Sequence, residues 1–140
     1  MAVFNKFQNF VQDLGRGVHN LDTGVLKVML TNAAPVAATN TVKADLTEIA
    51  AGNGYSAGGA TIAGTDYTQT SGTGNLTGTD PVITAAGGSI GPFRYAVLYN
   101  DTPTSPADPL IGYWDYGSSI SLADTEALTV DLAANFLTVA

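Results

Sequence analysis

The sequence predicts a mainly β protein, an antiparallel β-sandwich or jelly roll behind a short N-terminal amphipathic helix. Short apolar stretches with a period of two follow one another along the chain, turn-forming residues separate them, and no strand–helix–strand alternation appears. The length of 140 residues suits one domain with its own core. We therefore expect a single domain over 1–140, with residues 1–18 as a helix or arm and residues 23–140 as the sandwich.

The first segment is predicted to be the helix. Its apolar residues recur at steps of three and four, the period of one helical face. They are Phe4, Phe7, Phe10, Val11, Leu14 and Val18. Three phenylalanines give a short helix a large apolar surface to bury, so the helix either covers an open end of a sheet or docks on a partner. Phe4, Phe7 and Phe10 are the candidate partner-binding residues, with a place in the core as the equal alternative.

Period-two alternation predicts the strands that follow. They are 26–30, 61–69, 75–77, 82–84, 93–99, 110–116, 120–122, 128–132 and 135–139. Residues 43–51 are predicted to form a short helix capped by Thr41, and residues 117–119 to turn the chain. Alternation is thin in the Gly- and Thr-rich stretch 55–89, where a flexible arm is the alternative to short strands.

Six aromatic residues are concentrated in the C-terminal half. They are Phe93, Tyr95, Tyr99, Tyr113, Trp114 and Tyr116. The interpretation that we favour is sandwich core with tyrosine hydroxyls at its rim. The alternative is that one alternating set faces outward as a platform for a sugar or another subunit.

Composition and charge exclude several classes of function. Charged residues make up 12% of the chain, and the five Lys and Arg are scattered within a net charge of −7, so we expect no nucleic-acid binding. The absence of cysteine excludes disulfides and thiol chemistry. Neither a secretory signal nor an apolar stretch of roughly 20 residues is present, so we expect no membrane segment and synthesis in a cytoplasm.

Few residues are suited to nucleophilic or acid–base chemistry. His19 is the single histidine, no serine lies in a Gly-x-Ser-x-Gly elbow, and we expect His19 to be solvated or to cap the helix end. The tripeptide Asp22-Thr23-Gly24 also occurs in aspartic proteases, but here it occurs once and follows no apolar strand. An ordinary turn is therefore predicted for it.

Acidic residues lie close together in two loops. Asp101 and Asp108 flank one loop, and Asp124 and Glu126 stand in another. Surface turns routinely contain such residues, and no calcium-loop pattern is present. We expect no catalytic residue, no cofactor and no metal site, and a protein that is not an enzyme.

Segments along nearly the whole chain share their pattern with one class of proteins. They are Phe4–Phe7, Leu26–Asn32 with Ala34-Pro35, Leu46–Tyr55, Gly91–Tyr95, Tyr99–Thr102 and Pro109–Gly117. These segments resemble those of small virion proteins of tailed bacteriophages, and they carry no catalytic signature. The resemblance implies a structural protein of the virion.

Within that class, the resemblance implies a capsid decoration, or cement, protein on the capsid surface. Such a protein stabilises the shell by binding between subunits of the major capsid protein, as a homo-oligomer (a dimer or trimer). Removing residues 1–17 is then expected to abolish shell binding and to spare the sandwich. A tail, neck or receptor-binding component of the virion is the alternative.

Overall fold

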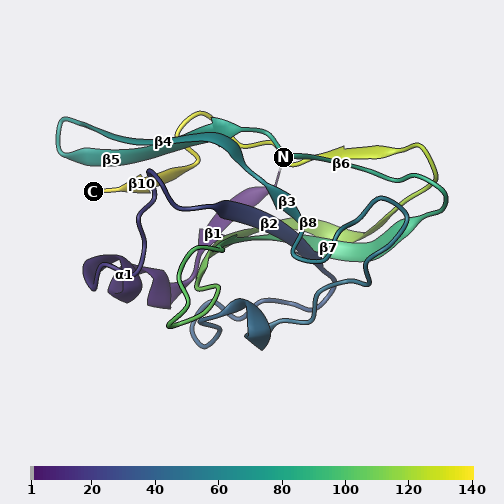
Figure 1. The fold of residues 1–140 in the computed structure, drawn as a ribbon, viewed down its shortest axis with the longest axis horizontal. Helices are drawn as coiled ribbons and strands as arrows, with labels where there is room; N and C mark the ends of the chain where they lie inside the picture. Colours follow the sequence, from purple (N-terminus) through teal and green to yellow (C-terminus); the bar gives the residue numbers. More distant parts are fainter. Residues whose placement is uncertain (1) are drawn as a thin grey trace.

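The computed structural model describes residues 2–140 and is mainly β (Figure 1). The strands are β1 (Val3–Lys6), β2 (Leu26–Thr31), β3 (Ala60–Thr61), β4 (Ala63–Thr70), β5 (Thr73–Thr79), β6 (Val82–Thr84), β7 (Ile90–Asn100), β8 (Leu110–Leu122), β9 (Ala127–Thr129) and β10 (Leu137–Val139). The helical segments are α1 (Gln8–Gly15) and the 3-10 turn η1 (Lys43–Asp45). The prediction of a mainly β, antiparallel fold with one short helix near the N-terminus is confirmed.

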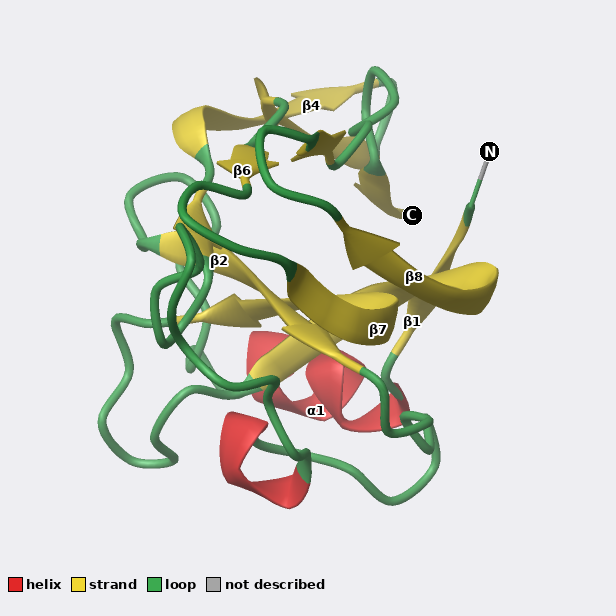
Figure 2. Cartoon of the chain, turned by 90° about the vertical axis from the view of Figure 1, so that its right-hand side faces the viewer, coloured by secondary structure: helices red, strands yellow, loops and turns green. Residues whose placement is uncertain are grey.

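The strands form three antiparallel sheets that stack in layers. The largest has the order β1-β8-β7-β2-β3, and two smaller sheets have the orders β10-β5-β4 and β6-β9. In Figure 1 the two smaller sheets lie above the five-stranded sheet, while α1 lies below it. Figure 2 shows the same arrangement from the side, with the helical segments on the opposite side of the sheet from β4 and β6.

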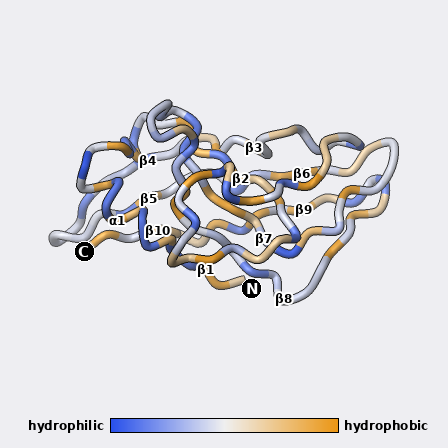
Figure 3. Tube along the Cα trace, turned by 90° about the horizontal axis from the view of Figure 1, so that it is seen from below, coloured by the Kyte–Doolittle hydropathy of each residue, from blue (hydrophilic) through white to orange (hydrophobic). Residues whose placement is uncertain are grey.

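Both faces of the five-stranded sheet are buried because its central strands are apolar on both sides. Along β7, Ala96 and Leu98 belong to the core cluster that faces the smaller sheets, and Tyr95 and Val97 belong to a second cluster. Phe7 joins that second cluster. Figure 3 shows the hydrophobic stretches on β2 and β7 in the middle of the molecule. A strand buried on both faces needs such a continuous apolar run.

The N-terminal segment is a strand followed by a helix, which corrects the prediction of one helix from Phe4 to Val18. Residues 3–6 pair with β8, and Phe4 stands opposite Trp114 with ring centroids 4.9 Å apart. α1 begins only at Gln8. Residues 3–6 form a strand because pairing with β8 satisfies their main-chain hydrogen-bonding groups and buries the Phe4 ring at the same time.

The predicted helix over 43–51 is also wrong after its first turn. η1 ends at Asp45, whose carboxylate accepts hydrogen bonds from the N–H groups of Thr41 and Val42. The next residues are extended, because the N–H of Ile49 donates to the C=O of Leu30 on the edge of β2. Tertiary pairing has overridden the local preference for a helix.

Two further boundaries differ from the prediction. Residues 117–119 do not turn the chain: β8 continues through them to Leu122, with Gly117 at a φ of 86°. The stretch 55–89 contains the strands β3 to β6, which lie where alternation predicted strands. For β6, the first and last residues are also the predicted ones. The predicted last strand is confirmed at the edge of its sheet as β10.

Candidate functional site

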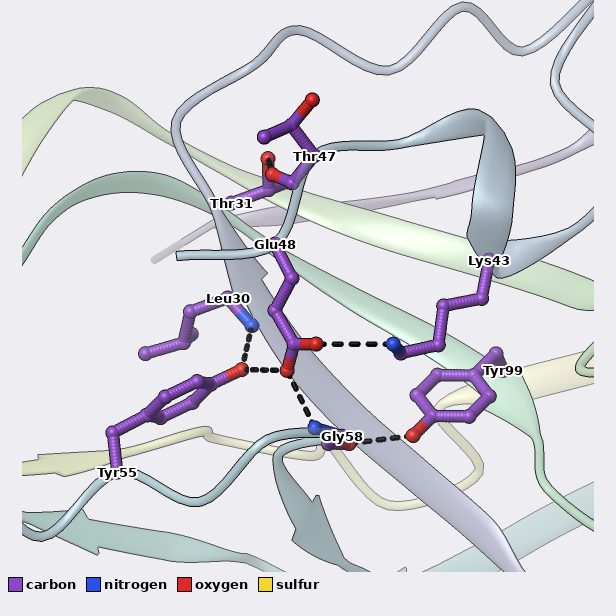
Figure 4. A network of polar contacts seen from close by, with 8 residues as sticks. All are labelled: Leu30, Thr31, Lys43, Thr47, Glu48, Tyr55, Gly58 and Tyr99. Carbon is purple, nitrogen blue, oxygen red and sulfur yellow. Dashed lines mark hydrogen bonds and ion pairs between the residues drawn. The ribbon is translucent and has the colours of Figure 1, made fainter. Parts of the chain in front are cut away.

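The densest polar network in the structure surrounds Glu48 (Figure 4). Its Oε1 accepts hydrogen bonds from the hydroxyl of Tyr55 and from the N–H of Gly58, both at 2.6 Å. Its Oε2 accepts a hydrogen bond from Nζ of Lys43 at 3.0 Å, and the Glu48 side chain is only 16% exposed. One carboxylate therefore holds three segments of the chain together.

Two tyrosines extend this network. The Tyr55 hydroxyl accepts a hydrogen bond of 3.0 Å from the N–H of Leu30, and the Tyr99 hydroxyl donates one of 2.6 Å to the C=O of Gly58. Burial raises the pKa of both phenols, and the hydrogen bond to Glu48 raises that of Tyr55 further. Both hydroxyls therefore remain protonated donors across the usual pH range.

The position of the network explains what it does. β3 covers only Lys27 and Val28 of the neighbouring strand β2. Beyond β3, the N–H of Leu30 bonds to Tyr55 and its C=O to Ile49, so the network closes the remaining edge of the sheet. We call Glu48, Lys43, Tyr55, Gly58 and Tyr99 the edge clamp. Because both of its carboxylate oxygens accept hydrogen bonds from protein donors, Glu48 is arranged to hold loops in place.

Sequence reasoning missed the edge clamp. Glu48 lies in the stretch 43–51 that was predicted to be a helix, and both Glu48 and Tyr55 lie in Leu46–Tyr55, which resembles virion proteins; neither prediction gave them a polar role. The available signal was the rarity of glutamate, since the chain has only Glu48 and Glu126. A rare charged residue within a largely uncharged stretch is a candidate for a specific partner.

The three predicted partner-binding phenylalanines lie largely inside the chain. Phe7 is 0% exposed and Phe10 is 1% exposed, in the two different core clusters, and Phe4 is half-buried against Trp114. The core interpretation, which the sequence left open, therefore applies to Phe7 and Phe10. In this conformation the apolar residue that α1 exposes is Val11, at 57%.

His19 is buried, which corrects the expectation of a solvated or helix-capping side chain. Its Nδ1 lies 3.2 Å from Nδ2 of Asn100, its ring packs on Phe10, and its Nε2 has no hydrogen-bond partner. Because Oδ1 of Asn100 accepts from the N–H of Thr102, Nδ2 is the atom that donates to His19. Burial lowers the pKa of His19, and the charge of Asp13 opposes that shift.

The Asp-Thr-Gly tripeptide forms the predicted turn. Oδ1 of Asn20 accepts hydrogen bonds of 3.1 Å from the N–H groups of Asp22 and Thr23, and the N–H of Gly24 donates to the C=O of Asn20. This is the turn chemistry of asparagine. Asn20 therefore organises the loop between α1 and β2.

The loop with Asp101 and Asp108 contains an ion pair. Asp101 lies 3.3 Å from Nζ of Lys27, and burial followed by the charge of Asp101 raises the pKa of Asp108. Asp108 also has a positive φ of 50°, a conformation that aspartate tolerates better than most residues. This acidic pair is therefore part of the loop's own structure.

Asp124 and Glu126 bond to main-chain groups of their surroundings. Asp124 accepts a hydrogen bond from the N–H of Gly87 at 2.9 Å, and Glu126 accepts one from the N–H of Ala123 at 2.6 Å. Within residues 2–140, no group of three or more His, Cys, Asp or Glu residues is placed to hold a metal ion. These carboxylates thus stabilise turns.

A hollow with a volume of about 470 Å³ opens beside β8. Its lining consists of Ala2, Trp114, Asp115, Tyr116, Gly117, Thr129 and Asp131. Arg94 binds both carboxylate oxygens of Asp115, at 2.8 and 3.1 Å, which leaves Asp131 as the other acidic group. Burial raises the pKa of Tyr116 to about 12. The hollow offers aromatic, hydroxyl and carboxylate groups to a polar ligand.

The six-residue aromatic cluster is mostly core. Phe93, Tyr95, Tyr99 and Trp114 are buried, and the two half-buried members are Tyr113 and Tyr116. The favoured interpretation therefore applies to four of the six rings. Tyr116, at the hollow, is the member best placed to meet a ligand.

Comparison with protein-family models, with curated proteins and with solved structures finds no match for this chain. Among residues 2–140, no helix has the length and apolar character needed to cross a membrane.

Proposed function

We propose that this protein is a structural component of a bacteriophage virion, a capsid decoration protein that binds between subunits of the major capsid protein. The observation that carries the proposal is the use of its polar groups: Glu48, Asp115 and Asp124 all bind donors of their own chain. Such an arrangement makes a rigid body with a contact surface, as a cement protein requires.

The positions of the resembling segments support the same proposal. Three of them, Leu26–Asn32, Gly91–Tyr95 and Pro109–Gly117, contain much of the central strands β2, β7 and β8, and Leu46–Tyr55 contributes the edge clamp. They are the scaffold of the molecule. The resemblance to virion proteins therefore concerns the parts that determine the fold, and fold alone leaves the binding surface open.

Binding to the shell is proposed to use the charge-poor exterior. The exposed apolar residues stand singly, at Val3, Val11, Val25, Val36 and Val82. Single apolar residues on a polar, weakly charged surface suit many weak contacts repeated by capsid symmetry. Phe7 and Phe10 contribute indirectly, by holding α1 in place.

Copy number in intact particles tests the proposal. We expect quantitative mass spectrometry of purified virions to find hundreds of copies of this chain, in a fixed ratio to the major capsid protein. A dozen copies or fewer would move it to the tail or neck. Its absence from washed particles would contradict a virion role.

The hollow beside β8 favours one second candidate, a receptor-binding component of the tail. Tyr116 and Trp114 line the hollow with Asp131 and Thr129, a combination that can stack on and hydrogen-bond to a sugar. Glycan-array binding that is lost in Tyr116→Ala, together with a low copy number, would select this candidate over decoration.

A further inference from the structure

β4 (Ala63–Thr70) is a long edge strand that no other strand of the described chain covers. It is the outermost strand of its sheet, with β5 as its neighbour. Its sequence, AGTDYTQT, contains no Pro, Lys or Arg, the residues that natural proteins place on edge strands to block pairing. Its side chains are exposed or half-buried throughout. The ladder with β5 is irregular between Ala63 and Asp66, where Gly64 has a φ of 62°, so β4 presents a regular row of free main-chain donors and acceptors from Asp66 to Thr70.

The other edges of the two larger sheets are short or closed. β1 has four residues and ends in Lys6, and β10 has three residues. At the β2–β3 edge, Ile49 and Tyr55 bond to the main chain of Leu30. Among these edges, β4 is therefore the one at which a further strand can pair.

The hairpin between β4 and β5 determines which main-chain groups point outward. Its two turn residues, Ser71 and Gly72, have φ values of 52° and 84°, as in a type I′ turn. In such a hairpin the flanking residues, Thr70 and Thr73, form a hydrogen-bonded pair, and such pairs alternate along the ladder. Every second residue of β4, counted back from Thr70, therefore bonds to β5.

The residues of β4 that lie between those bonded to β5 point their main-chain N–H and C=O groups away from β5. Thr68 and Asp66 follow Thr70 in the set that bonds to β5, through Asn75 and Thr77. The N–H and C=O groups of Gln69 and Tyr67 therefore face outward. A pairing strand must bond at those two residues.

We propose that β4 pairs antiparallel with β4 of a second copy of this chain, about a two-fold axis that passes through Tyr67. In this register the outward groups of Tyr67 meet those of Tyr67 in the second copy, and Gln69 stands opposite Thr65, where the irregular part of β4 begins. The same edge serves both copies, as a two-fold interface requires. The two three-stranded sheets join into one continuous sheet.

The charge of the strand favours a second copy as the occupant. Asp66 is the one charged residue of β4, and the register places it opposite Thr68 of the second copy. The flanking strands β5 and β10 contain no charged residue. Two chains of net charge −7 can therefore meet here without like charges directly opposite each other, since the two Asp66 residues are diagonal neighbours.

Substitution of Thr68 tests the register. Thr68→Asp places two aspartates against Asp66 of the opposite copies, and Thr68→Lys places two lysines there. We expect sedimentation equilibrium to show a dimer, twice the 14.3 kDa of one chain. The dimer Kd should rise about 2- to 30-fold in Thr68→Asp and fall in Thr68→Lys.

Thr138→Asp is the matched control. Thr138 lies in the same cross-strand row as Thr68, with Asn75 between them, but on the opposite edge of the sheet. It adds the same charge to the same face and should leave the Kd unchanged. A second variant, Gln69→Pro, removes an outward N–H and should give a folded monomer.

Each remaining outcome counts against the inference. A wild-type chain that stays monomeric at every concentration overturns it, as does a dimer that responds equally to Thr68→Asp and Thr138→Asp. Circular dichroism of each variant shows that the fold is kept. These measurements use the purified chain, so their failure leaves the proposed virion role untouched, and a low copy number in particles leaves the dimer untouched.

Discussion

In the five-stranded sheet both faces of β7 are buried and the free edge of β2 is closed by the edge clamp, whereas β4 of the three-stranded sheet has an open face and an open edge. The first sheet is built from apolar strands, with Met29 of β2 and Phe7 in one core cluster and Leu98 of β7 in the other. The second carries exposed threonines, among them Thr68 and Thr138. One chain thus contains a sealed sheet and an unsealed sheet.

The difference between the two sheets assigns the stability of the fold to the five-stranded sheet and contact with other chains to the three-stranded sheet. A strand buried on both faces gains free energy from packing and cannot meet a partner, and a polar strand with a free edge gains little and remains available. Substitutions in the sealed sheet should therefore change the free energy of unfolding, and substitutions in the open sheet should change association.

The largest effect is expected for Phe7→Ala. Phe7 is fully buried, and its ring lies 5.2 Å from that of Tyr113 on the helix side of the sheet. We expect the free energy of unfolding in urea to fall by about 3–5 kcal/mol. Val11→Ala, on the exposed side of α1, is the control and should cost within about 0.5 kcal/mol.

The burial of Phe7 also changes the expected effect of removing residues 1–17. Because that deletion removes β1, Phe7 and Phe10, we now expect it to unfold the domain, rather than to spare the sandwich. A deletion variant with an intact cooperative transition would show that the helix side of the five-stranded sheet is dispensable for stability.

The next effect is expected for Glu48→Ala. The substitution leaves the Tyr55 hydroxyl, the Gly58 N–H and the Lys43 ammonium without their acceptor. Such a loss costs about 1–3 kcal/mol, and hydrogen exchange should become faster at Leu30 and Gly58. Asp22→Ala, in an exposed turn, should leave exchange there unchanged. Unaltered protection at Leu30 would mean that the clamp does not close the edge.

A pH effect is expected from His19. Its pKa in the folded protein lies below the usual value of 6.5, so the unfolded chain binds more protons as the pH falls below 6.5. The corresponding stability is fully present above pH 6.5 and is lost as the pH falls toward the lowered pKa. Urea titrations between pH 7.5 and pH 5 should show this loss, and His19→Gln should lessen the slope. Equal slopes would exclude His19 as the source.

The smallest effect is expected on the open face of the three-stranded sheet. Thr138 is exposed, and its side chain makes no hydrogen bond in the described structure. Thr138→Val should change the free energy of unfolding by no more than about 0.5 kcal/mol. A loss of several times that amount would show that this face is structurally sealed after all, and would remove the contrast with the five-stranded sheet.

The fold was predictable where one signal dominates. Alternation over 93–99 and 110–116 gave β7 and β8, because a long apolar strand has few other ways to bury itself. The N-terminal segment was ambiguous, since Phe4 and Phe7 are spaced as on a helix but are divided between β1 and the residue before α1. Pairing with β8, far along the chain, decided it.

The polar sites were less predictable because their partners are distant in sequence. His19 was expected in solvent, and it is buried because Asn100 provides a hydrogen bond from the end of β7. The edge clamp depends on Glu48 accepting hydrogen bonds from Tyr55 and Gly58, and on Tyr99, far along the chain, donating one to Gly58. Local sequence patterns do not indicate hydrogen bonds between residues that are distant along the chain.

The pairing of β1 with β8 also constrains the order in which the molecule can be assembled. Val3 stands opposite Asp115, so β1 can pair with β8 only after the residues between them have been synthesised. Until then Phe4 and Phe7 have no complete pocket, and the unpaired apolar segment is open to chaperones or to premature association. The contact between β1 and β8 is therefore a long-range one, and long-range strand pairing slows folding.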